Sequence, residues 1–361
     1  MPHWIDTPAA LEARLQHRPA RIGLDTEFVR ERTFWPQLAL VQIAVEDEIL
    51  LVDALVPGMA QALAPVLADP AVTKVMHSAS EDLVAFKVSC GVLPTPLFDT
   101  QMAAALAGIA AGIGYQKLVE RITGVSLPKG ETRSDWLRRP LSEAQLHYAA
   151  DDVRYLFALH DALRAQLQET GRLSWLEEDC ARFVENAAQD EPERWPHLAV
   201  RSAQFLDAPA QQRLVRLLRW REAQARSSDK PRSWILDNEL AATLARTPPT
   251  DRDALLRLFD GQPKAPRKLA DAVWHALTTP VEDEAGLPLA RTASDGDKAL
   301  LKRLQDAVSR HSETLGLPDG VLASRRYLEA LLESGRWPGA LSGWRRTQLE
   351  PLLAPLLPSA G

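Results

Sequence analysis

Two carboxylates stand two positions apart in the apolar run IGLDTEF, residues 22–28. Because alternate residues of a strand point to the same side, Asp25 and Glu27 would project together, while Leu24 and Thr26 face the other way. Neighbouring carboxylates repel one another unless a cation neutralises them. A solvated strand end is the common explanation for one such pair, so the pair alone leaves both a metal site and an exposed edge open.

A third acid follows the expected strand TKVM, in the segment HSASEDL. Ser78 and Glu81 have the spacing of a capping box, which places Asp82 in the first turn of the next helix. Ligands of α/β sheets bind at the carboxyl ends of strands, where Asp82 would lie. A carboxylate that interacts with the helix dipole is the common alternative.

The segment HYAADDVRYL supplies a tyrosine and a fourth acid on one expected helix. Ser142 and Gln145 have capping-box spacing and mark the start of this helix. Tyr148 and Asp152 are four residues apart and share one face, whereas Asp151 points away from it. A solvated helix face is the ordinary interpretation of a single pair of this kind.

Together the four acids indicate a metal site. The candidate ligands are Asp25, Glu27, Asp82 and Asp152. They offer hard oxygen atoms with no histidine or cysteine cluster beside them, which suits Mg²⁺ or Mn²⁺. Two such ions about 4 Å apart can activate a water and stabilise the leaving oxygen in phosphoryl transfer, and Tyr148 could orient that water. The predicted cofactor is therefore two divalent metal ions.

Short apolar runs predict the sheet that would hold these residues. The runs typical of strands are residues 21–29, 37–45, 48–56 and 73–79. Residues 81–90 predict a helix that ends at Gly91, and helical spacing dominates residues 100–170. The N-terminal part is therefore expected to be an α/β domain with a mixed sheet and with helices late in the sequence.

The C-terminal half lacks strand signals. Residues 211–226 form an amphipathic pattern that recurs 86 positions later, where Leu214 matches Leu300 and Leu218 matches Leu304. The repeat predicts two small all-helical modules. The predicted organisation is an α/β domain at 1–190, a connector at 191–206, and helical domains at 207–285 and 295–358.

Three motifs, LDTEF, HSASED and YAADD, resemble in this order the exonuclease motifs of the DEDD superfamily, in its tyrosine-bearing DEDDy branch. The sequence between the motifs is similar to the ribonuclease D family. The segment WREAQARSSDKPRSWILDNEL resembles the helicase-and-RNase-D C-terminal (HRDC) domain. The resemblance implies an α/β, RNase H-like exonuclease domain followed by two small all-α HRDC-type domains.

The activity implied by this resemblance is that of a 3′-to-5′ exoribonuclease. Such an enzyme removes 5′-mononucleotides by two-metal-ion hydrolysis and matures the 3′ ends of tRNA precursors and other small structured RNAs. By the same resemblance, Asp25 bridges both metals, and Glu27 and Asp152 complete the site on the nucleophile side. Asp82 holds the metal of the leaving group, and Tyr148 positions the attacking water. The relatives also imply a monomer without an obligate protein partner.

Two alternative functions stay open on the sequence alone. A non-catalytic RNA-binding scaffold could use the same fold, although it would have no need of every ligand. A DNA 3′-to-5′ exonuclease would use the same chemistry. Since no polymerase region accompanies the motifs and paired helical modules follow them, a free-standing RNA-trimming enzyme is favoured.

Basic and aromatic residues are candidates for substrate binding. Those close to the motifs are His77, Lys129 and Arg133. Residues 201–232 contain eight basic side chains against three acids, and Arg216 and Arg219 in this stretch predict a phosphate-binding surface. Solvated surface charges are the alternative. Phe34 and Trp35 could stack on a terminal base, although aromatic residues of a core are the commoner case.

Composition limits the remaining possibilities. The 361 residues carry a formal net charge of -6, so any site for a polyanion must be regional. The two cysteines, Cys90 and Cys180, form neither a disulfide framework nor a zinc motif. No signal segment and no run of about 18 apolar residues occurs, so a cytoplasmic protein without a membrane span is expected.

Overall fold

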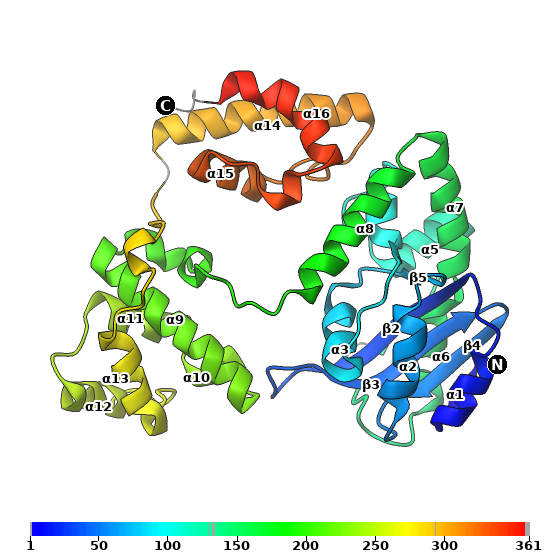
Figure 1. Ribbon diagram of the computed structural model, residues 1–361, viewed down its shortest axis with the longest axis horizontal. Helices are drawn as coiled ribbons and strands as arrows, with labels where there is room; N and C mark the ends of the chain where they lie inside the picture. The colour runs from blue at the N-terminus through cyan, green and yellow to red at the C-terminus, as the bar shows by residue number, and fades with distance from the viewer. Residues whose placement is uncertain (1, 129, 132–133, 293, 358–361) are drawn as a thin grey trace. The chain divides into compact units, whose positions relative to one another are not determined.

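The N-terminal part of the chain is built on one six-stranded mixed sheet (Figure 1). The structure is a computed structural model that describes residues 2–128, 130–131, 134–292 and 294–357. The strands are β1 (His3–Ile5), β2 (Arg21–Val29), β3 (Gln37–Val45), β4 (Glu48–Asp53), β5 (Thr73–Met76) and β6 (Leu97–Asp99). Their order is β1-β4-β3-β2-β5-β6, with β2 antiparallel to β3 and parallel to β5. β2 therefore lies inside the sheet, with a neighbour on each side.

The strands predicted from apolar runs are confirmed, and so is the mixed α/β fold. β4 ends at Asp53 and β5 at Met76, both earlier than the apolar runs suggest. β1 and β6 were missed because each has 3 residues, too few to show an alternating pattern.

Eight helices of the described chain accompany this sheet. They are α1 (Pro8–Arg14), α2 (Met59–Ala68), α3 (Ser80–Cys90), α4 (Thr100–Leu106), α5 (Tyr115–Thr123), α6 (Glu143–Arg154), α7 (Leu156–Glu169) and α8 (Leu173–Ala188). Their apolar faces form one core with the strands, in which Leu24 of β2, Phe86 of α3 and Leu156 of α7 are fully buried. Among the described residues, no helix has the length and apolarity needed to cross a membrane.

The two predicted capping boxes have different outcomes. At α6 both hydrogen bonds of the box form between Ser142 and Gln145, as predicted. At α3 the prediction is wrong, because no side-chain capping bond is made within the segment. The carboxylate of Asp99, from β6, instead accepts hydrogen bonds from the backbone N–H groups of Ser78 and Ala79. A partner distant in sequence thus holds the turn before α3, although α3 itself has no side-chain cap.

The long helical pattern after Ser142 is interrupted at Tyr155, where α6 ends and α7 begins. The hydroxyl of Tyr115, on α5, donates to the carbonyl of Asp151 over 2.9 Å and accepts from the backbone N–H of Tyr155 over 3.2 Å. These bonds satisfy backbone groups that a helix end leaves without partners. They hold the end of α6 that carries Asp151 and Asp152.

The described chain divides into two compact units. The first holds the residues up to Val29, from Gln37 to Gln189, and from Asp295 onward. The second holds Arg30–Pro36 and Asp190–Ser294. The short loop that follows β2 therefore belongs to the second unit rather than to the unit that contains the sheet.

The second unit is a small helical bundle. Its helices are α9 (Ala208–Ser228), α10 (Arg232–Ile235), α11 (Asn238–Arg246), α12 (Arg252–Asp260) and α13 (Ala270–Thr278). Fully buried Leu214, Leu244 and Phe259 form part of its core. Aspartates cap the starts of α9, α11 and α12 by accepting backbone N–H groups, which fixes where these helices begin.

The C-terminal helices are α14 (Asp295–Leu315), α15 (Arg325–Ser334) and α16 (Trp344–Leu353). α9 and α14 each have 21 residues, which agrees with the internal repeat. The C-terminal helices share the core of the first unit, however, through Leu301 and Leu304. Trp344 also stacks on Trp175 of α8, with ring centroids 4.3 Å apart. The predicted second helical domain, 295–358, thus packs with the α/β domain, and its status as a separate domain stays a prediction.

Candidate active site

Strand β2 presents two acids on one face of the sheet. Leu24 and Thr26 are buried, whereas Asp25 and Glu27 are only partly buried and point to the opposite side, as the alternation of the strand requires. A bulge between Glu27 and Phe28 interrupts the pairing with β3 just beyond the second acid. Bulges re-aim the side chains next to them, and the pairing resumes beyond this one at Phe28 and Val29.

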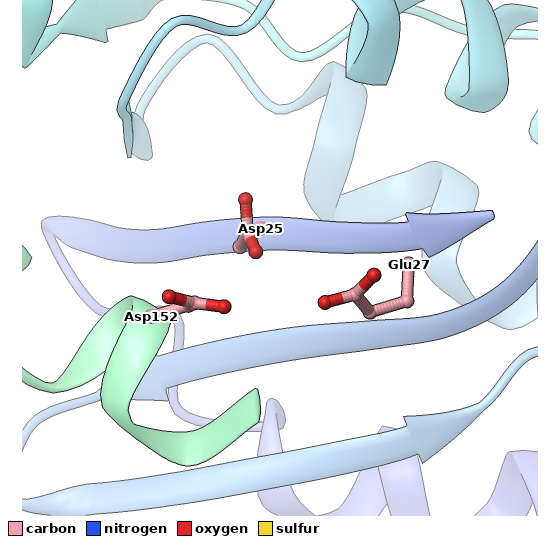
Figure 2. Close-up of side chains that lie close together, drawn as sticks. All are labelled: Asp25, Glu27 and Asp152. Carbon is pink, nitrogen blue, oxygen red and sulfur yellow. The ribbon is translucent and has the colours of Figure 1, made fainter. Parts of the chain in front are cut away.

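A third acid joins this pair from α6. Asp25, Glu27 and Asp152 each offer a carboxylate oxygen, and these oxygens all lie within 4.8 Å of one another. Figure 2 shows the Asp152 side chain reaching from its helix toward the two side chains of β2. This spacing lets several of the carboxylates contact a single cation, and oxygen ligands of this kind suit hard divalent metals. The donor set therefore fits a divalent metal ion.

The three clustered acids have raised pKa values. Burial is the main cause for Asp25, whose pKa lies well above its usual range, and repulsion from Asp82, Asp152 and Glu27 adds to it. Burial, with repulsion from Asp152 and Asp82, raises the pKa of Glu27 to about 8. Burial raises the pKa of Asp152 to about 7, although its hydrogen bond with Tyr148 opposes the shift. The metal-free cluster therefore holds protons that a bound cation would displace.

Asp82 is placed differently from the other three acids. It lies in the first turn of α3, as predicted, and is only 8% exposed. The hydroxyl of Thr26 donates a hydrogen bond to its carboxylate, from the side of β2 opposite to Asp25. Burial raises the pKa of Asp82 to about 6. Its charge also contributes to the raised pKa of Asp25, so Asp82 lies near the cluster without being one of the three that converge.

Tyr148 is placed on the same face of α6 as Asp152, as the spacing predicted. Their side chains are hydrogen-bonded, and burial together with the nearby carboxylates raises the pKa of the Tyr148 hydroxyl. The phenol is therefore neutral at physiological pH. A cavity of about 190 Å³ opens here, lined by Leu24, Asp25, His77, Tyr115, Tyr148 and Asp152. The tyrosine hydroxyl and the acids thus border one small polar space.

His77 lines this cavity, but both of its ring nitrogens have partners. Nδ1 lies 2.9 Å from the hydroxyl of Thr100, and Nε2 lies 3.1 Å from the carbonyl of Ile113. Burial lowers the pKa of His77, which favours the neutral ring. The contacts hold the ring at the wall of the site, and a contact with substrate stays a prediction.

Sequence reasoning missed two residues that border the acids. Gln42 lies directly across from Asp25 in the β2–β3 pairing, and its amide nitrogen is 3.5 Å from Asp25 Oδ2. It is fully buried, and its position inside the apolar run QLALVQIAV was a signal. Tyr115 lines the cavity and holds the end of α6. Nothing in its local sequence pointed to that role.

The remaining substrate-binding predictions have mixed support. Lys129 and Arg133 lie outside the described residues. In the second unit, Arg216 donates to both carboxylate oxygens of Glu284 over 2.6 Å, and Arg219 donates to Asp283 over 2.7 Å. Both guanidinium groups are thus already engaged inside the chain. Their contact with RNA stays a prediction, and the ion pairs favour a structural role.

Phe34 and Trp35 belong to the second unit through the loop that follows β2. Phe34 is 4% exposed and packs with Ala225 and Ile235. The carboxylate of Asp229 accepts the backbone N–H groups of both aromatic residues, over 2.9 and 3.0 Å. Stacking of Phe34 on a base would require it to leave this core, so the structure favours the alternative of a core aromatic.

The chain matches two family models, one described as 3′-5′ exonuclease over residues 2–168 and one described as HRDC domain over residues 210–277. It is 65% identical over 358 residues to ribonuclease D of Xanthomonas oryzae pv. oryzae, covering 99% of each chain. It is 38% identical over 370 residues to ribonuclease D of Pseudomonas paraeruginosa, covering 99% of this chain and 98% of that protein.

Among solved structures, the chain is similar to Escherichia coli RNase D, described as an exoribonuclease involved in structured RNA processing. The TM-score is 0.85 with 30% identity, and the match covers 99% of this chain and 98% of that one. The predicted RNase H-like exonuclease fold, followed by a helical HRDC domain, is therefore confirmed. One HRDC match is found, so a second HRDC domain stays a prediction. Because its sequence is 65% and 38% identical to two ribonuclease D proteins over nearly the full length of each, the chain belongs to the ribonuclease D family.

Proposed function

We propose that this chain is a metal-dependent 3′-to-5′ exoribonuclease that removes 5′-mononucleotides from RNA ends. The observation that carries the proposal is the convergence of Asp25, Glu27 and Asp152 beside the hydroxyl of Tyr148, in a chain of the ribonuclease D family. The relative from E. coli is described as acting in structured RNA processing. The natural substrates proposed here are accordingly the 3′ ends of tRNA precursors and other small structured RNAs.

Two divalent ions, Mg²⁺ or Mn²⁺, are the proposed cofactors. Asp25, Glu27 and Asp152 would hold them, because their oxygens are close enough to share a cation and their mutual repulsion favours one. Asp82, the fourth candidate ligand, would hold the metal of the leaving group through an intervening water. Divalent metals supply activation of a water nucleophile and stabilisation of a leaving oxygen in phosphoryl transfer.

The side chains of α6 would orient the reacting water. Tyr148 keeps its proton, because burial and nearby acids raise its pKa, so its hydroxyl can donate to or accept from a water beside Asp152. Leu24, His77 and Tyr115 also line the cavity in which this water would lie. Tyr115 would further act by holding the end of α6, and thus the position of Asp152.

The proposed activity is tested with a 5′-labelled single-stranded RNA that carries a free or a blocked 3′ end. In Mg²⁺, the RNA with a free 3′ end should shorten from that end as a ladder, while the RNA with a blocked 3′ end stays intact. A matched DNA should be degraded much more slowly. Binding of RNA without cleavage would favour a non-catalytic scaffold, and equal cleavage of DNA would overturn the assigned substrate.

Replacing Tyr148 by phenylalanine is expected to lower kcat by about 10²-fold, with KM changed little. The ring would stay in place, and only the hydroxyl that orients the water would be lost. Steady-state kinetics on the same RNA measures both constants. Because Tyr148 is not among the clustered acids, the thermal stabilisation by Mg²⁺ should be retained in the variant. A variant with unchanged kcat would remove Tyr148 from the mechanism.

A further inference from the structure

A second cavity, of about 440 Å³, lies in the first unit and shares no lining residue with the active-site cavity. Its walls come from α4, from α8 and from residues 320–345. Small-molecule sites commonly have volumes of about 300–1,000 Å³, so this cavity has room for a ligand of moderate size. The proposed exonuclease reaction does not use it.

Two arginines and two acids define the charge beside this cavity. Asp179 is 8% exposed, and it accepts hydrogen bonds from the guanidinium groups of Arg182 and Arg345 and from the indole N–H of Trp344. Arg182 also donates to Glu178 over 3.1 Å, so the two carboxylates balance the two guanidinium charges. Further bonds run from Arg182 to the hydroxyl of Ser342 and from Arg345 Nε to the carbonyl of Val321. Within the described residues Arg182 Nε and Arg345 Nη2 make no hydrogen bond, and guanidinium N–H groups of this kind can bind phosphate oxygens.

The rest of the wall suits a planar polar group. The amides of Gln101 and Asn186 line the cavity and offer both donors and acceptors of hydrogen bonds. Tyr327 and Phe183 line it as well, and aromatic rings of this kind stack on nucleobases. A base and a phosphate could thus find partners in the same space.

One residue of the cavity and one residue of the active site are hydrogen-bonded to the same backbone carbonyl. Gln101, which lines the cavity, donates its amide N–H to the carbonyl of Ile113 over 3.0 Å. His77, which lines the active site, approaches the same carbonyl through Nε2 at 3.1 Å. A ligand that contacts Gln101 would therefore act on the carbonyl of Ile113, to which His77 in the wall of the active site is also hydrogen-bonded.

We propose that this cavity binds a nucleoside 5′-monophosphate. The phosphate would bind Arg182 and Arg345, and the base would lie between the aromatic side chains and the amides. The choice of ligand rests on the proposed function, since an exonuclease of this type releases nucleoside monophosphates. The cavity would then be a site where the reaction product binds outside the active site.

The test is isothermal titration of the full-length chain with adenosine 5′-monophosphate in the presence of EDTA. EDTA removes the cation that would hold a phosphate at the acids of the active site, so binding under this condition reports the cavity. Saturable binding with one site is expected. Inorganic phosphate alone should bind at least about tenfold more weakly, because it lacks the base that stacks. The absence of binding, or equal affinity for inorganic phosphate, would overturn the proposal.

Variants locate the site. Tyr327→Ala is expected to weaken binding by about tenfold through the loss of stacking, and Met102→Trp to abolish it by filling the cavity. Phe205→Ala is the matched control, because Phe205 is 70% exposed, lies in the second unit and does not line the cavity. Unchanged affinity in both cavity variants, with folding verified by their melting temperatures, would overturn the assignment.

The result of the nucleotide titration can be distinguished from the result of the RNA cleavage assay. Binding in EDTA does not depend on catalysis, and the RNA ladder does not depend on this cavity. A chain that degrades RNA but does not bind the nucleotide overturns only the cavity assignment. A chain that binds the nucleotide through Tyr327 but leaves RNA intact supports the binding site and overturns the proposed function.

Discussion

Replacing Asp25 by asparagine is expected to lower turnover of an RNA with a free 3′ end by about 10³-fold or more. Asp25 is the acid of β2 whose pKa is raised by the charges of all three other candidate ligands, so it occupies the electrostatic centre of the site. An amide there removes one negative charge and one strong oxygen ligand. Single-turnover cleavage at saturating Mg²⁺ measures the loss.

The variant should fold, because the metal-free site of the original chain already contains buried carboxylates that repel one another. A neutral amide at position 25 would relieve part of that repulsion, so the metal-free variant should melt at least as high as the original chain at pH 8. The variant should also lose most of the thermal stabilisation that Mg²⁺ confers. Turnover close to that of the original chain would contradict the assignment of Asp25.

The matched control is Asp151→Asn. Asp151 neighbours Asp152 in sequence, but its carboxylate pairs with Arg154 over 2.8 Å and does not join the cluster. The turnover of the Asp151→Asn variant should stay within about threefold of that of the original chain, since ion pairs as exposed as this one contribute little. A large loss in this control would mean that negative charge in general, rather than the geometry of the three acids, supports activity.

Local patterns predicted the parts of the site that depend on one element. The alternation of β2 placed Asp25 and Glu27 on one face, and helical spacing placed Tyr148 with Asp152. Both predictions required only the period of a single strand or helix. The order of the three motifs then connected these elements through the family resemblance.

The parts that were missed depend on contacts between distant segments. The turn that precedes α3 is held by Asp99 rather than by a capping box of Ser78, and the end of α6 is held by Tyr115. The partners of Arg216 and Arg219 lie on a turn far along the chain, at Glu284 and Asp283, so a basic helix that looked free in the sequence is paired in the fold. Periodicity carries no information on such pairings.

The second large expected effect is the loss of activity on removal of divalent metal. Excess EDTA should lower RNA cleavage by about 10³-fold or more, and added Mg²⁺ or Mn²⁺ should restore it. The reason lies in the acids themselves, since oxygens of Asp25, Glu27 and Asp152 lie within 4.8 Å of one another. Without a cation, the cluster holds protons or repels the phosphate of the substrate. Cleavage that persists in EDTA would contradict a metal-dependent mechanism.

The same acids predict how metal binding depends on pH. The pKa of Glu27 is raised from 4.5 to about 8, so its contribution to the stability of the metal-free chain is present below about pH 4.5 and is lost as pH rises through about 8. Asp152, with its pKa raised to about 7, acts in the same direction. A metal binds the ionised carboxylates, so its affinity should rise over this same range.

The rise in melting temperature caused by Mg²⁺ should therefore be small near pH 5.5 and large near pH 8. Melting curves in EDTA and in Mg²⁺ across this range measure the difference, with Glu27→Gln as the comparison. The glutamine variant lacks the proton that Mg²⁺ must displace at position 27, so its smaller stabilisation should change less with pH. A Mg²⁺ effect of equal size at both pH values would show that protons and metal do not compete for these acids, and would place the metal site elsewhere.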